Sequence, residues 1–252
     1  MGVVEMETNL AAIDRNLDAL DRTIRELELR YELGQISSQT LEQTRASRAA
    51  LVSTRQTLVS NISNYKLQLE LMAGGELTGQ VQLGALPRVT DQQLEEMNLE
   101  EDLAAAKEAS YDLYEAGLTL DDARETYNKA GGDSHYNKES YEWQAASHQW
   151  KAAQYTYDAA VQNFETAFRT LYLQVKDCKQ VLDAAGTALA VKQSDYAVAQ
   201  LKQEQGSISQ NELLEARDAV DEAREAADTA ANDLFSAYRT YRWAVDRGIL
   251  NY

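Results

Sequence analysis

The chain offers few side chains whose types and spacing would support chemistry. Its two histidines are His135 and His148. A helical di-iron site places a glutamate three residues before each histidine, but Gly132 and Ala145 occupy those positions. His135, beside Asp133 in a glycine-containing segment, is a weak metal candidate, and a solvated loop histidine is the simpler interpretation. We therefore expect no metal site.

Other catalytic arrangements are missing as well. The 41 acidic residues are spread around predicted helices rather than paired as a general acid and base. Gly74, Gly75, Gly79 and Gly84 do not follow a predicted strand, as a phosphate-binding loop would require. The single cysteine, Cys178, continues an apolar stripe and is expected to be a small buried hydrophobe. The sequence predicts a non-enzymatic protein without a cofactor.

Long helices dominate the predicted structure. Pro87 is the only proline, so little interrupts helices on either side of it. In the second half of the chain, large and small apolar residues alternate at steps of three and four, which is the spacing of a coiled-coil seam. Alternating sizes let two helices approach closely. The ladder reads Trp143, Ala146, Trp150, Ala153, Tyr157, Ala160, Phe164, Ala167 and Leu171.

Periodicity and glycines set the predicted elements. Helices are expected over about 5–33, 38–73, 90–130, 136–205 and 210–247, the fourth on the order of 100 Å long. Residues 1–73 form a first helical hairpin, 74–89 a linker, and 90–252 a second part with a hairpin tip at 206–209. The fold class is all-α, with elongated antiparallel coiled-coil hairpins in two structural repeats. Arg48 and Arg55 interrupt the stripe of the second helix and should face polar groups.

An internal repeat connects the two hairpins. An offset of 172 residues aligns Gly34 with Gly206 and Ile36 with Ile208, within collinear heptads. Each copy reads helix, Gly-x-Ile-Ser, helix. In a tight helical hairpin the glycine supplies a positive φ, the isoleucine tucks between the helices, and the serine caps the next helix.

Composition excludes several partners. The chain has 252 residues, 24 of them basic, and a formal net charge of -17. This acidity disfavours nucleic acid and anionic lipid surfaces, which both require clustered Lys and Arg. No stretch approaches the roughly 20 apolar residues of a membrane helix. We expect no direct insertion into a membrane by this chain.

The two tip segments, Tyr31-Glu-Leu-Gly-Gln-Ile-Ser37 and Gln203-Glu-Gln-Gly-Ser-Ile-Ser209, resemble the TolC-type outer-membrane efflux family. Residues 97–106 are also similar to the opening of a repeat in that family. The resemblance covers most of the chain: about 5–73 is similar to the later part of repeat one, and about 90–248 to nearly all of repeat two.

The resemblance implies a component of an efflux or secretion conduit. In the family, three chains pool their hairpins into a helical barrel, and the tips meet an adaptor protein. It therefore implies a homotrimer and an adaptor partner. The implied docking residues are Gly34, Gln35, Ile36, Ser37, Gly206, Ser207, Ile208 and Ser209.

The chain departs from the family pattern in both repeats, because the strands of repeat one, expected before residue 5, are absent as well as those of repeat two. The family inserts membrane strands before each long helix, whereas only residues 131–138 stand there, too few for two strands of about 9–11 residues. The resemblance is therefore to the helical domain without the β-barrel strands. We expect an exported periplasmic or cell-envelope protein whose leader is absent from this sequence. The alternatives are a stand-alone scaffold coiled coil, at the cell surface or in the cytosol, and a ferritin-like or other small-ligand enzyme, which the missing ligand pattern disfavours.

Overall fold

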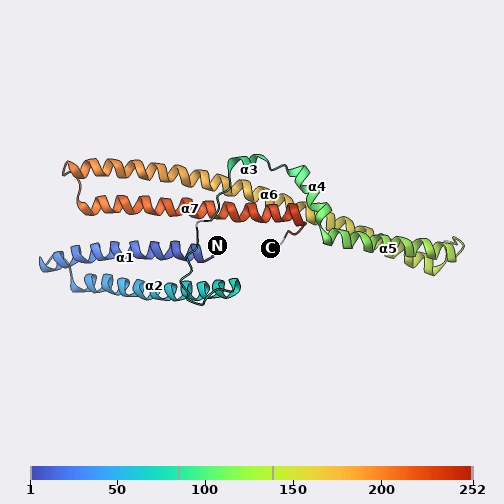
Figure 1. Ribbon diagram of the computed structural model, residues 1–252, viewed down its shortest axis with the longest axis horizontal. Helices are drawn as coiled ribbons and strands as arrows, with labels where there is room; N and C mark the ends of the chain where they lie inside the picture. The colour runs from blue at the N-terminus through green and yellow to red at the C-terminus, as the bar shows by residue number, and fades with distance from the viewer. Residues whose placement is uncertain (1, 85, 138, 251–252) are drawn as a thin grey trace. The chain divides into compact units, whose positions relative to one another are not determined.

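The computed structural model of the chain describes residues 2–84, 86–137 and 139–250. Figure 1 shows that these residues form long helices folded back on one another at short turns. The described residues contain no strand, so the predicted all-α class is confirmed. The helices are α1 (Gly2–Glu32), α2 (Ser38–Ala73), α3 (Asp91–Glu95), α4 (Leu99–Ala109), α5 (Tyr111–Asp133), α6 (Tyr141–Glu204) and α7 (Gln210–Arg247).

The chain divides into two compact units. The first comprises Met1–Pro87 and Val181–Asn232, and the second comprises Arg88–Gln180 and Asp233–Tyr252. Helices α6 and α7 each contribute residues to both units. The sequence-based division into 1–73, 74–89 and 90–252 follows the repeats along the chain instead, and it stays a prediction.

Helices α1 and α2 form the first antiparallel hairpin of the first unit (Figure 1). Leu17 and Ile24 of α1 are buried and stand one heptad apart, and Leu41 and Ile62 of α2 are buried and stand three heptads apart. Apolar side chains at heptad spacing therefore form the seam of this hairpin. Tyr31 is 47 % exposed, so the seam of α1 ends before the tip.

The apolar ladder of α6 lies on its covered face. Ala146 and Phe164 are buried, and the other ladder residues are half-buried. Trp150 stacks on Tyr127 of α5 with ring centroids 4.9 Å apart. Cys178 is half-buried, and burial raises the pKa of its thiol. The ladder is thus a packing seam, as its spacing predicts.

The segment before the long helix is broken more often than predicted. In place of one helix over about 90–130, α3 ends at Glu95 and a further break falls at Ser110. Ser110 is buried, and its hydroxyl caps α5 by accepting a hydrogen bond from Leu113 N at 3.4 Å. Gly248 lies so close that a Cβ there would stand 2.3 Å from Ser110 Cα. Contact with a residue so far along the chain explains why local periodicity misses this break.

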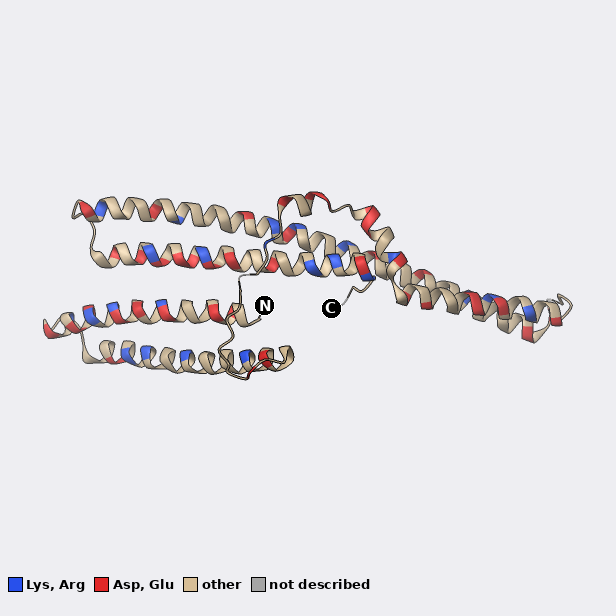
Figure 2. Cartoon of the chain, viewed as in Figure 1, with Lys and Arg blue, Asp and Glu red and all other residues tan. Residues whose placement is uncertain are grey.

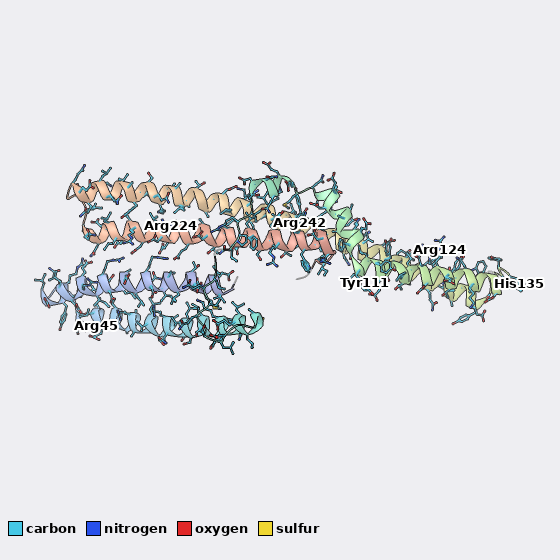
Figure 3. The ribbon with its side chains drawn as sticks, in the orientation of Figure 1. Arg45, Tyr111, Arg124, His135, Arg224 and Arg242 are labelled. Atoms are coloured by element: carbon cyan, nitrogen blue, oxygen red, sulfur yellow. The ribbon has the colours of Figure 1, made fainter. Side chains whose placement is uncertain are left out.

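The turn between α5 and α6 also differs from the prediction. Helix α5 runs through Gly131 and Gly132 to Asp133, and α6 begins at Tyr141 rather than near 136. Gly131 is needed for packing, because a Cβ there would lie 3.1 Å from Trp143 Nε1. The positive φ values after the helix belong instead to His135, at 52° in the loop seen in Figure 3, and to Tyr136, at 59°.

In the second unit, Tyr241 of α7 is fully buried against Phe168 of α6, with ring centroids 5.4 Å apart. Its hydroxyl donates a hydrogen bond to the carboxylate of Asp102 on α4. This contact joins three helices through one side chain.

None of the described helices is both long enough and apolar enough to span a membrane.

Candidate functional site at the hairpin tips

The two predicted tips have the same backbone geometry. Gly34 has a φ of 68° and Gly206 a φ of 72°, both in the left-handed region. After α1, Gly34 N donates to Tyr31 O at 2.9 Å and Gln35 N to Arg30 O at 2.9 Å. This pair of bonds is the Schellman motif, which satisfies the last carbonyl groups of a helix.

The second tip repeats these bonds. Gly206 N donates to Gln203 O at 2.9 Å, and Ser207 N donates to Lys202 O at 2.8 Å. Helix α1 ends at Glu32 and α6 at Glu204, while α2 begins at Ser38 and α7 at Gln210. Both pairs of helix ends are separated by the offset of 172 that aligns the sequences, so the repeat extends to the structure of the tips.

The side chains of the tips divide into anchored and exposed groups. Ile36 and Ile208 are half-buried, which agrees with an isoleucine tucked towards its hairpin. The other six predicted docking residues are exposed. Each tip therefore presents polar side chains and backbone groups to solvent around one anchored apolar residue. Whether a partner binds there is left to a proposal below.

The two tips differ in how the second helix is capped. Ser37 precedes α2 with an extended backbone but makes no capping hydrogen bond with its side chain. At the second tip, Ser209 Oγ accepts from Glu212 N at 3.2 Å, and Ser209 N donates to the Glu212 carboxylate at 2.7 Å. This is a capping box. The hydrogen bonds from the backbone and hydroxyl of Ser209 hold the pKa of Glu212 below its usual value.

Charged residues on α1 face both neighbouring helices in the first unit. Towards α2, acidic side chains recur every seven residues and pair with basic ones. The ion pairs are Glu7 with Lys66, Asp14 with Arg55, Asp21 with Arg48, and Glu28 with Arg45. The expectation that Arg48 and Arg55 face polar groups is confirmed. The hydrogen bond from Arg48 lowers the pKa of Asp21.

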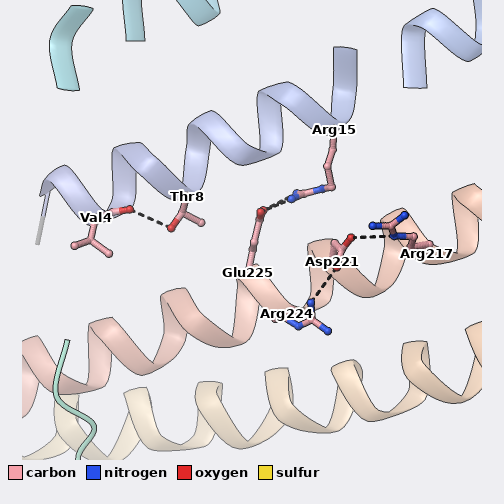
Figure 4. A network of polar contacts seen from close by, with 7 residues as sticks. All are labelled: Val4, Thr8, Arg15, Arg217, Asp221, Arg224 and Glu225. Carbon is pink, nitrogen blue, oxygen red and sulfur yellow. Dashed lines mark hydrogen bonds and ion pairs between the residues drawn. The ribbon is translucent and has the colours of Figure 1, made fainter. Parts of the chain in front are cut away.

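Towards α7, α1 presents basic side chains. Arg15 makes a two-bond contact with Glu225, one of whose bonds is 2.6 Å, and Arg22 pairs with Asp218. Figure 4 shows Arg15 reaching from α1 to Glu225 on α7. All four side chains are at most 26 % exposed. Partial burial strengthens such pairs relative to fully exposed ones.

A polar groove lies between α1 and α7 on this side of the first unit. Its volume is 450 Å³, and its lining includes Arg22, Arg25, Asn211 and Arg217. Figure 2 shows acidic and basic residues interspersed along both helices. This charged interface was not predicted, although Arg15 and Arg22 of α1, and Asp218 and Glu225 of α7, stand seven residues apart in the sequence and are a signal for it.

No group of three His, Cys, Asp or Glu side chains in the described part of the chain is arranged to hold a metal ion. His135 lies in a loop and His148 is an exposed residue of α6.

Comparison with known proteins adds a structural likeness. Neither a protein-family model nor a curated protein matches the sequence. The outer membrane protein VceC of Vibrio cholerae matches over 98% of this chain and 69% of its own, with 11% identity and a TM-score of 0.58. CusC, whose structures concern transmembrane channel formation, matches over 98% of this chain and 74% of its own, with 13% identity and a TM-score of 0.64. The fold is that of the helical part of TolC-like outer membrane channels.

The CmeC outer membrane channel of Campylobacter jejuni shows the same fold over 98% of this chain and 60% of its own, with 14% identity and a TM-score of 0.52. At these identities the likeness establishes the fold, while function must be argued from the tips and the helix faces.

Proposed function

We propose that the chain is a non-enzymatic, TolC-like helical component of an efflux or secretion conduit, and that its hairpin tips dock an adaptor protein. The observation that carries this proposal is the pair of equivalent tips. Residues 34–37 and 206–209 close two coiled-coil hairpins with the same turn, in a fold shared with outer membrane channels. Exposed tips of rigid helices can bind a partner without rearranging a core.

We further propose that copies of the chain associate through the outer faces of α2 and α6. Within the chain, α1 of one repeat packs on α7 of the other. The repeat offset maps Arg15 and Arg22 of α1 onto Thr187 and Ser194 of α6. It maps Asp218 and Glu225 of α7 onto Ala46 and Ser53 of α2. These four counterparts are exposed, small and uncharged.

A contact between α6 of one copy and α2 of the next would reproduce, between copies, the α1–α7 contact found within each copy. Such a head-to-tail contact joins two different surfaces, so it closes into a ring when the rotation between copies allows. Exposed apolar residues support this role for the outer face of α6: Val191 and Val198 are 53 % and 48 % exposed. A trimer of this kind fits an exported, envelope-associated conduit.

Site-specific photocrosslinking tests the docking proposal. A benzophenone amino acid replaces Gln35 or Ser207 in the full chain within its native cell, and Gln43 of α2 serves as an exposed control position. We expect the two tip positions to crosslink the same helical adaptor protein and the control to leave it free. Equal crosslinking of the adaptor at all three positions contradicts the assignment of the tips as the docking site. Crosslinks from the tip positions only to other helices of this chain contradict it as well.

Light scattering across a range of protein concentrations tests self-association. We expect a trimer that Val191→Glu dissociates, whereas Gln200→Glu, at an exposed position on the opposite side of α6 from Val191, leaves it intact. A wild-type chain that stays monomeric at all concentrations refutes the ring and favours the stand-alone scaffold.

A further inference from the structure

Glu70, in the last turns of α2, is a buried carboxylate that the tip-docking function does not use. It is 7 % exposed. Its side chain accepts hydrogen bonds from four consecutive backbone groups of the linker: Thr78 N at 2.6 Å, Gly79 N at 2.7 Å, Gln80 N at 3.1 Å and Val81 N at 3.0 Å. The hydroxyl of Thr78 adds a fifth bond at 2.9 Å.

The main chain of Glu70 holds the start of the same linker. Helix α2 ends at Ala73, the following residue Gly74 has a φ of 69°, and Gly75 N donates to Glu70 O at 2.9 Å. Thus one residue fixes the linker twice, first through its carbonyl and then through its carboxylate. Successive backbone N–H groups that converge on one point form a nest for an anion. Here the anion is a side chain of the preceding helix.

The linker approaches α2 closely at the nest. A Cβ at Gly79, whose φ is 66°, would lie 3.0 Å from Ser63 Oγ and 3.3 Å from Leu67 Cγ. Ser63 and Leu67 precede Glu70 by two turns and one turn of helix. The linker therefore turns back along α2 after the helix ends, and only glycine fits at its point of contact.

Beyond the nest, the linker reaches the open end of the first hairpin. Leu83 and Leu86 line a mainly apolar cavity of 520 Å³ together with Val3 of α1 and Leu69 of α2. This end lies opposite the tip, where no turn joins the two helices. The path of the linker thus decides whether these apolar groups are covered.

We propose that Glu70 is the latch of a strap, residues 78–84, that fastens the open end of the α1–α2 hairpin. With the carboxylate ionised, the nest is filled and the strap lies along α2. Without the charge, only one of the two oxygens still accepts, so backbone N–H groups of the nest lose their acceptor and the strap detaches. This inference concerns the first hairpin alone and does not depend on the proposed function.

The latch is closed at neutral pH. Backbone hydrogen bonds, that of Gly79 foremost, hold the pKa of Glu70 below its usual 4.5. The carboxylate is therefore charged above about pH 4.5, and the latch is lost only as pH falls through the depressed value. Charged groups on the elements at this end of the hairpin include Glu5 and Glu7 of α1, Lys66 of α2, which pairs with Glu7 at 2.6 Å, and Glu76 of the linker.

Amide hydrogen exchange of the full chain at neutral pH tests the latch. In Glu70→Gln the shape is kept and the charge is lost, so exchange at residues 78–81 should accelerate at least about tenfold. Glu76→Gln, in the same linker, should leave these amides unchanged. Unaltered exchange at 78–81 in Glu70→Gln overturns the proposal, and so does an equal acceleration in both variants.

Two further measurements separate a latch from a general loss of stability. The amide proton shifts of residues 78–81 should titrate together below pH 4.5 in the wild type and should stop titrating in Glu70→Gln. Gly79→Ala should also detach the strap, because its Cβ would crowd Ser63 and Leu67 of α2. Amide exchange at residues 78–81 should be no faster in the double variant Glu70→Gln/Gly79→Ala than in either single variant. Additive acceleration of exchange in the double variant would overturn the assignment of Glu70 as the latch. Titration of the four amides at different pH values would overturn it as well.

Discussion

Replacing Gly206 by alanine isolates the backbone conformation of the second tip. The residue has a φ of 72°, and no atom lies within 4 Å of where a Cβ would stand. The cost therefore comes from the left-handed conformation alone, which is roughly 1–2 kcal/mol for an L-residue. Gly206→Val should cost more, because its branched Cβ resists positive φ.

Gly186 provides a matched control in the same helix hairpin. It lies in the interior of α6, is exposed, and also has no atom within 4 Å of a Cβ. Alanine there gains about 0.8–1.0 kcal/mol of helix propensity. The two glycine-to-alanine changes should thus have opposite signs and differ by roughly 2–3 kcal/mol.

Hydrogen exchange at the turn measures the local cost directly. The amide of Ser207, which donates to Lys202 O at 2.8 Å, should exchange about 5–30 times faster in Gly206→Ala. Gly34→Ala should weaken the first tip to a similar extent, because its φ is 68° and its surroundings are equally open. If Gly206→Ala leaves Ser207 unchanged, or if Gly186→Ala weakens the protein, the reasoning from φ is refuted.

Three other predictions concern packing and charge. Gly248→Ala should destabilise the second unit by at least about 2 kcal/mol in urea unfolding, because its Cβ would overlap Ser110. Tyr241→Phe should cost about 1–3 kcal/mol in the same assay, since it removes a buried donor from Asp102. Helical circular dichroism should fall on acidification only below about pH 4.5, as native carboxylates with depressed pKa values become protonated. These carboxylates include Asp21, Glu165 and Glu212.

A different outcome would contradict each of these three predictions. Gly132→Ala, where a Cβ meets nothing within 4 Å, is the control for Gly248→Ala, and equal effects would exclude the steric explanation. A Tyr241→Phe variant as stable as the wild type would mean that the buried hydroxyl contributes nothing. Loss of helix already above pH 6 would show that groups other than these carboxylates govern acid unfolding, because a lowered pKa stabilises the fold at all higher pH values.

The sequence predicts the hairpins because their signals are local. Gly34 and Gly206 stand where the chain needs a positive φ, and heptad spacing identifies the seams around Leu17 and Phe164. Both signals lie within a few turns of the elements that they define, so no knowledge of distant contacts is required.

Features that depend on contacts between residues far apart in the sequence are not predicted by local sequence patterns. The break at Ser110 depends on Gly248, and the latch at Glu70 uses backbone donors that every residue carries. The sequence predicts that the helix ends at about 130, but Gly131 serves packing against Trp143 within α5, and the left-handed residues are His135 and Tyr136. A glycine in a pattern thus indicates a constraint without saying whether the constraint is on φ or on space.

The charged line on α1 has a consequence for how the first hairpin is aligned. An apolar seam that repeats every seven residues tolerates sliding by seven, because each side chain meets an equivalent hole. The acidic residues of α1 also recur every seven residues, so such a slip would bring Asp14 to Lys66 and Asp21 to Arg55 and would re-form most of the ion pairs. The register of this hairpin is therefore set by its turn, because the hydrogen bonds of Gly34 and Gln35 fix where α1 ends.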